Sequence, residues 1–296
     1  MPMASALLNS EAWYNLLAKL VTHSDNSKFP HLLAKACQQV SHYDSTLITA
    51  YPKDQRPVHI YNNLPAEQIT LTLAPYFAGA YVLDPFYALC QNKSPNGIYR
   101  LKDLGPDLFF RSEYFRSYYA GTQLQDETGL LISVNPDLYV VVSLGQRTSD
   151  DELSKVRVNS LQTISALLVS LCQKFWRAGG TGMEMIYGKA DEEQQLYGAS
   201  LDKTFMNFGR DFLSERECEV VRLILKGHSS KSIARVLDIS PYTVKVHRKR
   251  FHAKLEVTSQ AELFSLFFGA ISLAPISSDE DPLSYYFAEH PRQEAF

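Results

Sequence analysis

The chain of 296 residues has only four cysteines, and they are scattered. Cys37, Cys90, Cys172 and Cys218 form no CxxC pair, so the spacing of a disulfide framework or a zinc knuckle is missing. We therefore expect four reduced, mostly buried thiols. No metal site and no cofactor are predicted.

Long apolar runs are missing too. No segment approaches the roughly 20 apolar residues that a membrane-spanning helix needs. The opening MPMASALLNSEAW lacks the basic start and the apolar core of a signal peptide, because Glu11 interrupts it. These absences predict a cytoplasmic protein with no membrane partner.

The motifs of common catalytic sites are also absent. The sequence has no GxSxG, no P-loop and no HExxH. Gly180 and Gly182 begin a GxG, but Met185 stands where a dinucleotide-binding loop needs its third glycine. Histidines and cysteines are not clustered, so we predict that the protein is not an enzyme.

What the chain does have is an uneven charge. Its formal net charge is −3, yet residues 210–260 hold 11 Lys+Arg against 6 Asp+Glu, a net of +5, which leaves −8 elsewhere. A small basic unit inside an acidic protein predicts a localised anion-binding surface. The length and the 45% content of hydrophobic residues predict about two globular domains.

Residues 1–178 have the pattern of one mixed domain. Helices are predicted at 10–23, 29–40, 66–78, 112–120 and 151–177, and strands at 47–51, 58–61, 130–134 and 138–144. The last two strands flank Asn135-Pro136-Asp137 and should form a hairpin. Helices at both ends of a set of strands predict an α+β fold with a covered sheet. The helix at 151–177 has an apolar stripe of Leu153, Val156, Leu161, Ile164, Leu168, Leu171 and Phe175.

Two other stretches are expected to be poor in structure. Residues 179–209 contain six of the 14 glycines and a polar run at 191–195, which favours a linker with at most one short helix. The end of the chain at 271–296 is expected to be a weakly anchored tail.

The strongest pattern lies between them, at residues 210–270. Ser214 and Glu217 have the spacing of a capping box at the start of a helix, and Gly227 is placed to end it. A second helix fits 231–237, with Ser229 or Ser230 as its cap.

A third helix fits 241–255, capped by Ser240 and begun by Pro241. Val244, Phe251 and Leu255 recur on one side, which is therefore predicted to be buried. Two short helices joined by a tight turn are typical of a helix-turn-helix, whose second helix enters the DNA major groove. The candidate contacts to bases and phosphates are Lys245, Val246, Lys249, Thr243, Tyr242, His247, Arg248, Lys231 and Ser229, with Arg250 and Lys254 flanking them.

Two of these residues have open alternatives. His247 could instead be a partly buried structural histidine, and Tyr242 could be either a phosphate contact or a capping aromatic.

These residues together resemble the LuxR-type (GerE-like) helix-turn-helix regulators. The matching positions are 213–217, Gly227, Lys231, 233–234, Leu237, 239–240, 243–247, 254–255, Val257 and 261–263. The resemblance implies an all-α domain of four helices, the fourth at 260–268, and a homodimer contact through Leu263, Leu266 and Phe267. It implies that Lys245, Val246 and Lys249 read the major groove, and that Thr243, His247 and Lys231 contact or position the backbone. Ser230 replaces a frequent asparagine, and Glu256 replaces the usual glycine before Val257.

The N-terminal half is rich in aromatic residues near its middle. Between Tyr76 and Tyr119 there are 12 in 44 positions, a content that suits either a ligand pocket or a core. Asp84-Pro85 resembles the Asp-Pro pair of the acyl-homoserine-lactone receptors, whose sensor domain is an α-β-α sandwich related to GAF and PAS folds. Their Trp-x-x-x-Tyr signature is absent, because Leu71 and Pro75 occupy its slots. We therefore expect a related fold with a different ligand, one whose amine or amide pairs with Asp84.

The candidate ligand contacts are Asp84, Tyr76, Tyr81, Phe86, Tyr99, Phe110 and Tyr118. The sequence thus predicts a dimeric transcriptional regulator that binds double-stranded DNA and responds to a small-molecule effector. One alternative is a DNA-binding regulator whose first half only dimerises. Another is a response regulator, although no acidic pair precedes Asp54 and 178 residues exceed the roughly 120 of a receiver.

Overall fold

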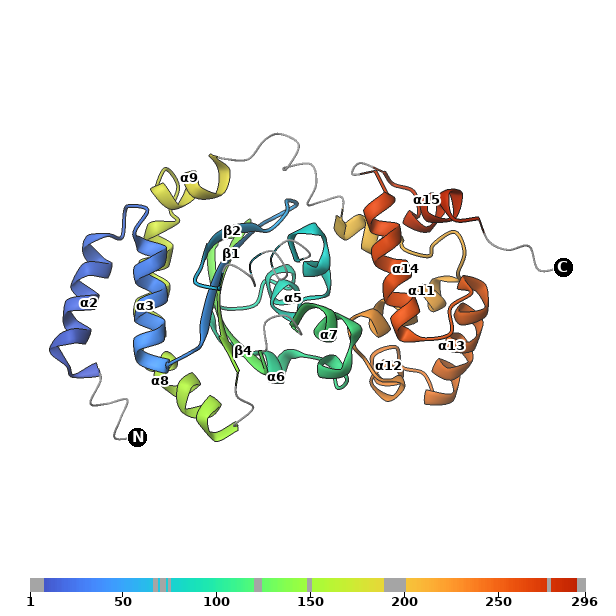
Figure 1. Ribbon diagram of the computed structural model, residues 1–296, viewed down its shortest axis with the longest axis horizontal. Helices are drawn as coiled ribbons and strands as arrows, with labels where there is room; N and C mark the ends of the chain where they lie inside the picture. Colours follow the sequence, from blue (N-terminus) through green and yellow to red (C-terminus); the bar gives the residue numbers. More distant parts are fainter. Residues whose placement is uncertain are drawn as a thin grey trace.

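The computed structural model describes residues 8–65, 69, 73, 76–119, 124–147, 151–188, 201–275 and 278–291; the side chains of residues 118 and 151–154 are not described. Helices lie on both sides of a single sheet, and a helical unit follows it (Figure 1). The predicted α+β class is therefore confirmed.

A five-stranded sheet in the order β2-β1-β5-β4-β3 forms the centre of the first unit, with every neighbouring pair antiparallel. Its strands are β1 (Ser45–Pro52), β2 (Val58–Asn62), β3 (Gly97–Arg100), β4 (Asp126–Asn135) and β5 (Leu138–Gln146). The predicted hairpin forms, and β4 pairs Leu130 with Val142 of β5. Alternate side chains enter two separate cores: Val140 and Val142 belong to one, and Val141 belongs to the other.

Helices α3 (Phe29–Ser41), α8 (Asp151–Phe175) and α9 (Thr181–Tyr187) pack on one face of the sheet, and α2 (Glu11–Thr22) packs outside α3 (Figure 1). Leu161 and Leu168 of α8 are fully buried, as the apolar stripe predicts. The prediction that Val156 belongs to this stripe is wrong, because the residue is 53% exposed. Five positions from Leu161 correspond to a rotation of about 140° around the helix axis, which turns Val156 toward solvent.

The other face carries shorter elements. They are η1 (Ala80–Leu83), α5 (Pro85–Gln91), α6 (Leu101–Leu104), η2 (Phe109–Arg111) and α7 (Glu113–Tyr119). Phe86 of α5 packs closely against the sheet at Gly129, where an added Cβ would come within 2.4 Å of the ring. The helix predicted at 66–78 falls mostly outside the described residues.

The C-terminal unit contains all four predicted helices. They are α11 (Glu215–Leu225), α12 (Ser230–Val236), α13 (Pro241–Leu255) and α14 (Gln260–Leu273). A fifth helix, α15 (Pro282–Glu289), packs on α14, so the expectation of a weakly anchored tail is corrected. Asp281 explains the anchoring: its fully buried carboxylate accepts hydrogen bonds from the backbone N–H groups of Gly209, Asp211 and Leu283 at 2.9–3.0 Å.

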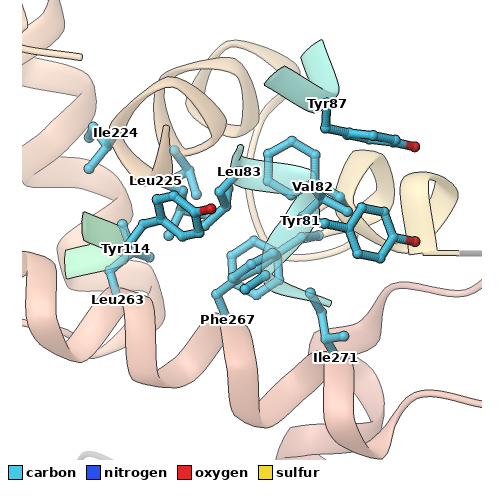
Figure 2. Packing of buried hydrophobic residues seen from close by; sticks show 14 of the residues in the cluster. Tyr81, Val82, Leu83, Tyr87, Tyr114, Ile224, Leu225, Leu263, Phe267 and Ile271 are labelled. Carbon is cyan, nitrogen blue, oxygen red and sulfur yellow. The ribbon is translucent and has the colours of Figure 1, made fainter. Parts of the chain in front are cut away.

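The two units share one continuous apolar core, which residues 201–208 also enter. Figure 2 shows its centre, formed by Tyr81, Val82, Leu83 and Tyr114 of the first unit and by Ile224, Leu225, Leu263, Phe267 and Ile271 of the second. Leu263 and Phe267, expected at a dimer contact, are fully buried within the chain itself. In this arrangement α14 packs on the first unit of its own chain.

Candidate functional site

Helix α13 owes its position to local chemistry at its start and to apolar packing along one side. The hydroxyl oxygen of Ser240 accepts a hydrogen bond from the Thr243 backbone N–H at 2.9 Å, and Pro241 stands at the first helical position, where its lack of an N–H costs nothing. Val244 and Phe251 are completely buried. The helix is therefore fixed with a defined outward face.

That outward face is basic. Tyr242 is 76% exposed, and Lys245, Lys249 and Arg250 are exposed as well. Helix α13 contains no acidic residue, so nothing on the helix itself offsets these charges. Half-buried side chains flank the exposed ones; they are Thr243, Val246, His247 and Arg248.

Helix α12 is capped by Ser229, one of the two residues that the sequence allowed. The Ser229 hydroxyl oxygen accepts from the Ser232 backbone N–H at 3.1 Å. Lys231, in the first turn, is exposed. Ser229 has a partner that no sequence pattern indicated, because both its amide and its hydroxyl donate to the carboxylate of Asp107 in the first unit. The candidate phosphate contact at Ser229 is thus occupied within the chain.

A pocket opens in the first unit, between the sheet and the segments that precede α5 and follow α7. Its cavity volume is about 30 Å³, and the open mouth brings the empty space to about 480 Å³. Among the described residues it is lined by Ser45, Leu47, Tyr51, Leu64, Tyr76, Asp84, Tyr119, Leu124, Glu127, Ser143 and Gly145. The lining mixes aromatic rings with a few convergent polar groups, as small-molecule sites generally do.

Asp84 is held at the edge of this pocket by two hydrogen bonds. One carboxylate oxygen caps α5 by accepting from the Phe86 backbone N–H at 2.8 Å, and the other accepts from the Tyr76 hydroxyl at 2.6 Å. The Tyr76 hydroxyl also lies 2.5 Å from that of Tyr51. Burial raises the pKa of Asp84 to about 6, although both hydrogen bonds act in the opposite direction.

Glu127 is a second buried acid in the same pocket. Its carboxylate accepts from the Tyr119 hydroxyl at 2.8 Å. Burial, and next the negative charge of Asp84, raise the pKa of Glu127 to about 7. Sequence reasoning missed this residue. The available signal was an acid three residues before the strand predicted at 130–134.

The other candidate ligand residues have different places. Tyr81 and Phe86 are buried core residues, and Phe110 packs on Phe109 and Phe115. Tyr99 of β3 donates its hydroxyl to the Pro95 carbonyl at 2.8 Å. None of these four lines the pocket, because the aromatic segment supplies mainly the core between the two units. The side chain of Tyr118 lies outside the described part. Tyr76 and Asp84 are the candidates that the structure brings together at the pocket.

Comparison with known proteins gives the C-terminal unit a family. Residues 211–267 match the family described as bacterial regulatory proteins, luxR family. A predicted HTH-type transcriptional regulator from the exeN 3′ region of Aeromonas salmonicida is 29% identical over 199 residues, which cover 67% of this chain and all of that protein. The nitrate/nitrite response regulator NarP of Escherichia coli is 35% identical over 94 residues, or 31% of this chain and 41% of NarP.

Two solved structures align with this chain. The VqsR ligand-binding domain from Pseudomonas aeruginosa aligns with a TM-score of 0.49 and 23% identity over 56% of this chain and 95% of its own. Escherichia coli SdiA aligns with a TM-score of 0.37 and 17% identity over 87% of this chain and 97% of its own. No described helix is long and apolar enough to cross a membrane.

The family match shows that the chain carries, at residues 211–267, the LuxR-type helix-turn-helix domain of bacterial transcriptional regulators.

Proposed function

We propose that the protein is a transcriptional regulator that binds duplex DNA through α13 and responds to a small molecule held between Asp84 and Glu127. The exposed basic face of a correctly capped α13 carries the first half of this proposal. A helix of this kind fits the major groove, where its early side chains meet base edges. Lys245, Val246 and Lys249 are the proposed contacts to the bases. The proposed contacts to the DNA backbone are Tyr242, Thr243, His247, Arg248 and Lys231.

The DNA half is tested by selecting bound duplexes from a random-sequence pool and measuring affinity for the winner by gel shift. Lys245→Ala and Lys249→Ala should each weaken specific binding by roughly 1–3 kcal/mol. Lys19→Ala is the matched control, because Lys19 is an exposed lysine on α2, beyond the sheet. Wild-type affinity in both α13 variants would refute the assignment.

The pocket supports the ligand half. Two acids line one cavity, and no Lys or Arg is among the described lining residues. A ligand with amine or amide N–H groups would supply donors to both carboxylates and offset their burial. Asp84 and Glu127 are therefore the proposed polar contacts, with Tyr51, Tyr76 and Tyr119 as the aromatic wall.

Native mass spectrometry of the purified full chain tests this half. A retained molecule that carries nitrogen, and is lost in Asp84→Asn and Glu127→Gln, is the expected result. The same spectra give the mass of the assembly, and we propose a homodimer because a symmetric pair reads two half-sites. A dimer that never retains a molecule would favour the alternative in which the first unit only dimerises.

The response-regulator alternative receives no support from the sheet. Receivers of that class have a doubly wound fold built on parallel strands. Every strand pair in the described sheet is antiparallel.

A further inference from the structure

We propose that the loop at Asp107 is a latch, in which this carboxylate of the first unit occupies the donors of Ser229 and lowers the affinity of the helix-turn-helix for DNA. This inference rests on the proposed DNA binding, and it adds a residue-level mechanism for restraining it. It begins from a contact between segments 122 residues apart in the chain.

The contact has two donors and one acceptor group. The backbone N–H of Ser229 donates to Oδ1 of Asp107 at 2.9 Å, and the Ser229 hydroxyl donates to Oδ2. Burial alone would raise the pKa of Asp107, but the two hydrogen bonds from Ser229 outweigh it and lower the pKa. The carboxylate is therefore charged at neutral pH and is held by charge-assisted hydrogen bonds.

A backbone contact extends the latch beside this pair. The Leu108 backbone N–H donates to the Gly227 carbonyl at 3.0 Å. Gly227 has a φ of +93°, and a Cβ added there would lie 2.9 Å from the Cα of Phe109. Glycine at this position thus serves two purposes: it ends α11, and it lets the loop backbone approach the turn before α12.

The latch is placed to oppose DNA. A serine amide and hydroxyl at the start of the first helix of a helix-turn-helix are typical donors to DNA phosphate. Here a carboxylate takes both donors and brings a negative charge to the place of a phosphate. The outward face of α13 stays exposed at Tyr242, Lys245 and Lys249. The latch should therefore weaken binding rather than abolish it.

A row of aromatic contacts joins the latch to the pocket. Tyr119, which lines the pocket and donates to Glu127, stacks on Phe115 with ring centroids 4.6 Å apart. Phe115 in turn contacts Phe109, two residues after Asp107, at 5.8 Å. A ligand that moves the Tyr119 ring would therefore act on the base of the latch loop.

The first experiment measures the affinity of the full chain for a mixed-sequence duplex of about 30 base pairs at low salt, where phosphate contacts dominate binding. Asp107→Asn and Asp107→Ala should bind about 3- to 10-fold more tightly than wild type, as loss of an exposed charge-assisted contact allows. Asp103→Asn is the matched control, because it removes the same charge from an exposed position four residues away. Equal affinities for wild type and both Asp107 variants would overturn the latch.

A second experiment closes the latch covalently. In a variant with Asp107→Cys and Ser229→Cys, the oxidised form should bind the duplex at least 10-fold more weakly than the same protein after reduction. The native cysteines do not complicate this comparison, because all four are buried. Equal binding by the oxidised and reduced forms would contradict the proposal. If wild type binds duplex and these variants do not differ from it, the latch fails and DNA binding stands. If no form binds any duplex, both fail.

Discussion

Lys254 Nζ, near the end of α13, lies 2.7 Å from Oε2 of Glu217 in α11, and the same oxygen accepts from the Ser214 backbone N–H at 2.9 Å. Glu217 therefore completes a capping box and at the same time fixes the far end of the proposed recognition helix. The sequence placed Lys254 beside the DNA-facing surface. Its contact with a buried carboxylate gives it a structural role.

Removing this carboxylate should destabilise the fold. In Glu217→Ala the Ser214 N–H loses its acceptor and Lys254 loses its partner, so we expect the free energy of unfolding in urea at pH 7 to fall by about 1–3 kcal/mol. Glu219→Ala is the control, because its ion pair with Arg216 is partly exposed on both sides, and it should cost under about 1 kcal/mol. Equal losses in both variants would contradict the special role of Glu217.

The same pair predicts a dependence on acid. Burial would raise the pKa of Glu217, but the hydrogen bonds from Lys254 and Ser214 outweigh it and lower the pKa below the usual 4.5. A depressed pKa contributes stability that is present above 4.5 and is lost as the pH falls through the folded value. The difference in the free energy of unfolding between wild type and Glu217→Ala should therefore become smaller below pH 4.5.

Glu127 predicts the opposite trend near neutrality. Its pKa is raised from 4.5 to about 7, so between these values the folded protein holds a proton that the unfolded chain has released. Stability should therefore fall as the pH rises from 5 to 8, by up to about 3 kcal/mol from this group. Glu127→Gln should remove that part of the slope in urea unfolding, and Glu11→Gln, at an exposed position, should not. An unchanged slope in Glu127→Gln would refute the assignment.

The helix-turn-helix could be predicted almost completely because its signals are local. Ser214, Gly227, Ser240 and Pro241 each act within one turn of their own helix, and the structure confirms each boundary they mark. The pocket could be predicted only in part. Asp84 has a local signature in its Asp-Pro pair, but Glu127 reaches the cavity through the pairing of β4 in the sheet, which no spacing in the sequence encodes.

The contact between the two units was missed for a similar reason. A helix's apolar face shows that it packs on something, and it does not show on what. The faces of Leu263 and Phe267 suit a second copy or the same chain equally well by composition. In the structure they belong to the same apolar cluster as Leu83 and Tyr114 of the first unit (Figure 2).

Asp281 anchors the C-terminal helix, so its loss should loosen the helix-turn-helix unit. The carboxylate accepts from three backbone N–H groups and is fully buried, which leaves those donors unpaired in Asp281→Ala. We expect the free energy of unfolding in urea to fall by about 2–3 kcal/mol, and amide hydrogen exchange in α15 to become faster. Asp279→Ala is the control, since its ion pair with Lys203 is exposed. Unchanged exchange in α15 would show that apolar packing on α14 suffices.

Glu256 should be a position where stability can be gained. It ends α13 in the left-handed region, with φ 57° and ψ 35°, and its backbone N–H donates to the His252 carbonyl. A residue with a Cβ costs roughly 1–2 kcal/mol in this conformation, and glycine avoids that cost. A glycine variant also has a more flexible unfolded chain, which lowers the free energy of unfolding by roughly 0.4–1 kcal/mol. Glu256→Gly should therefore stabilise the protein by about 0.5–1 kcal/mol in urea unfolding, whereas Glu256→Ala, which keeps the Cβ, should give no gain. A destabilised glycine variant would mean that the Glu256 side chain contributes more to the fold than its backbone strain costs.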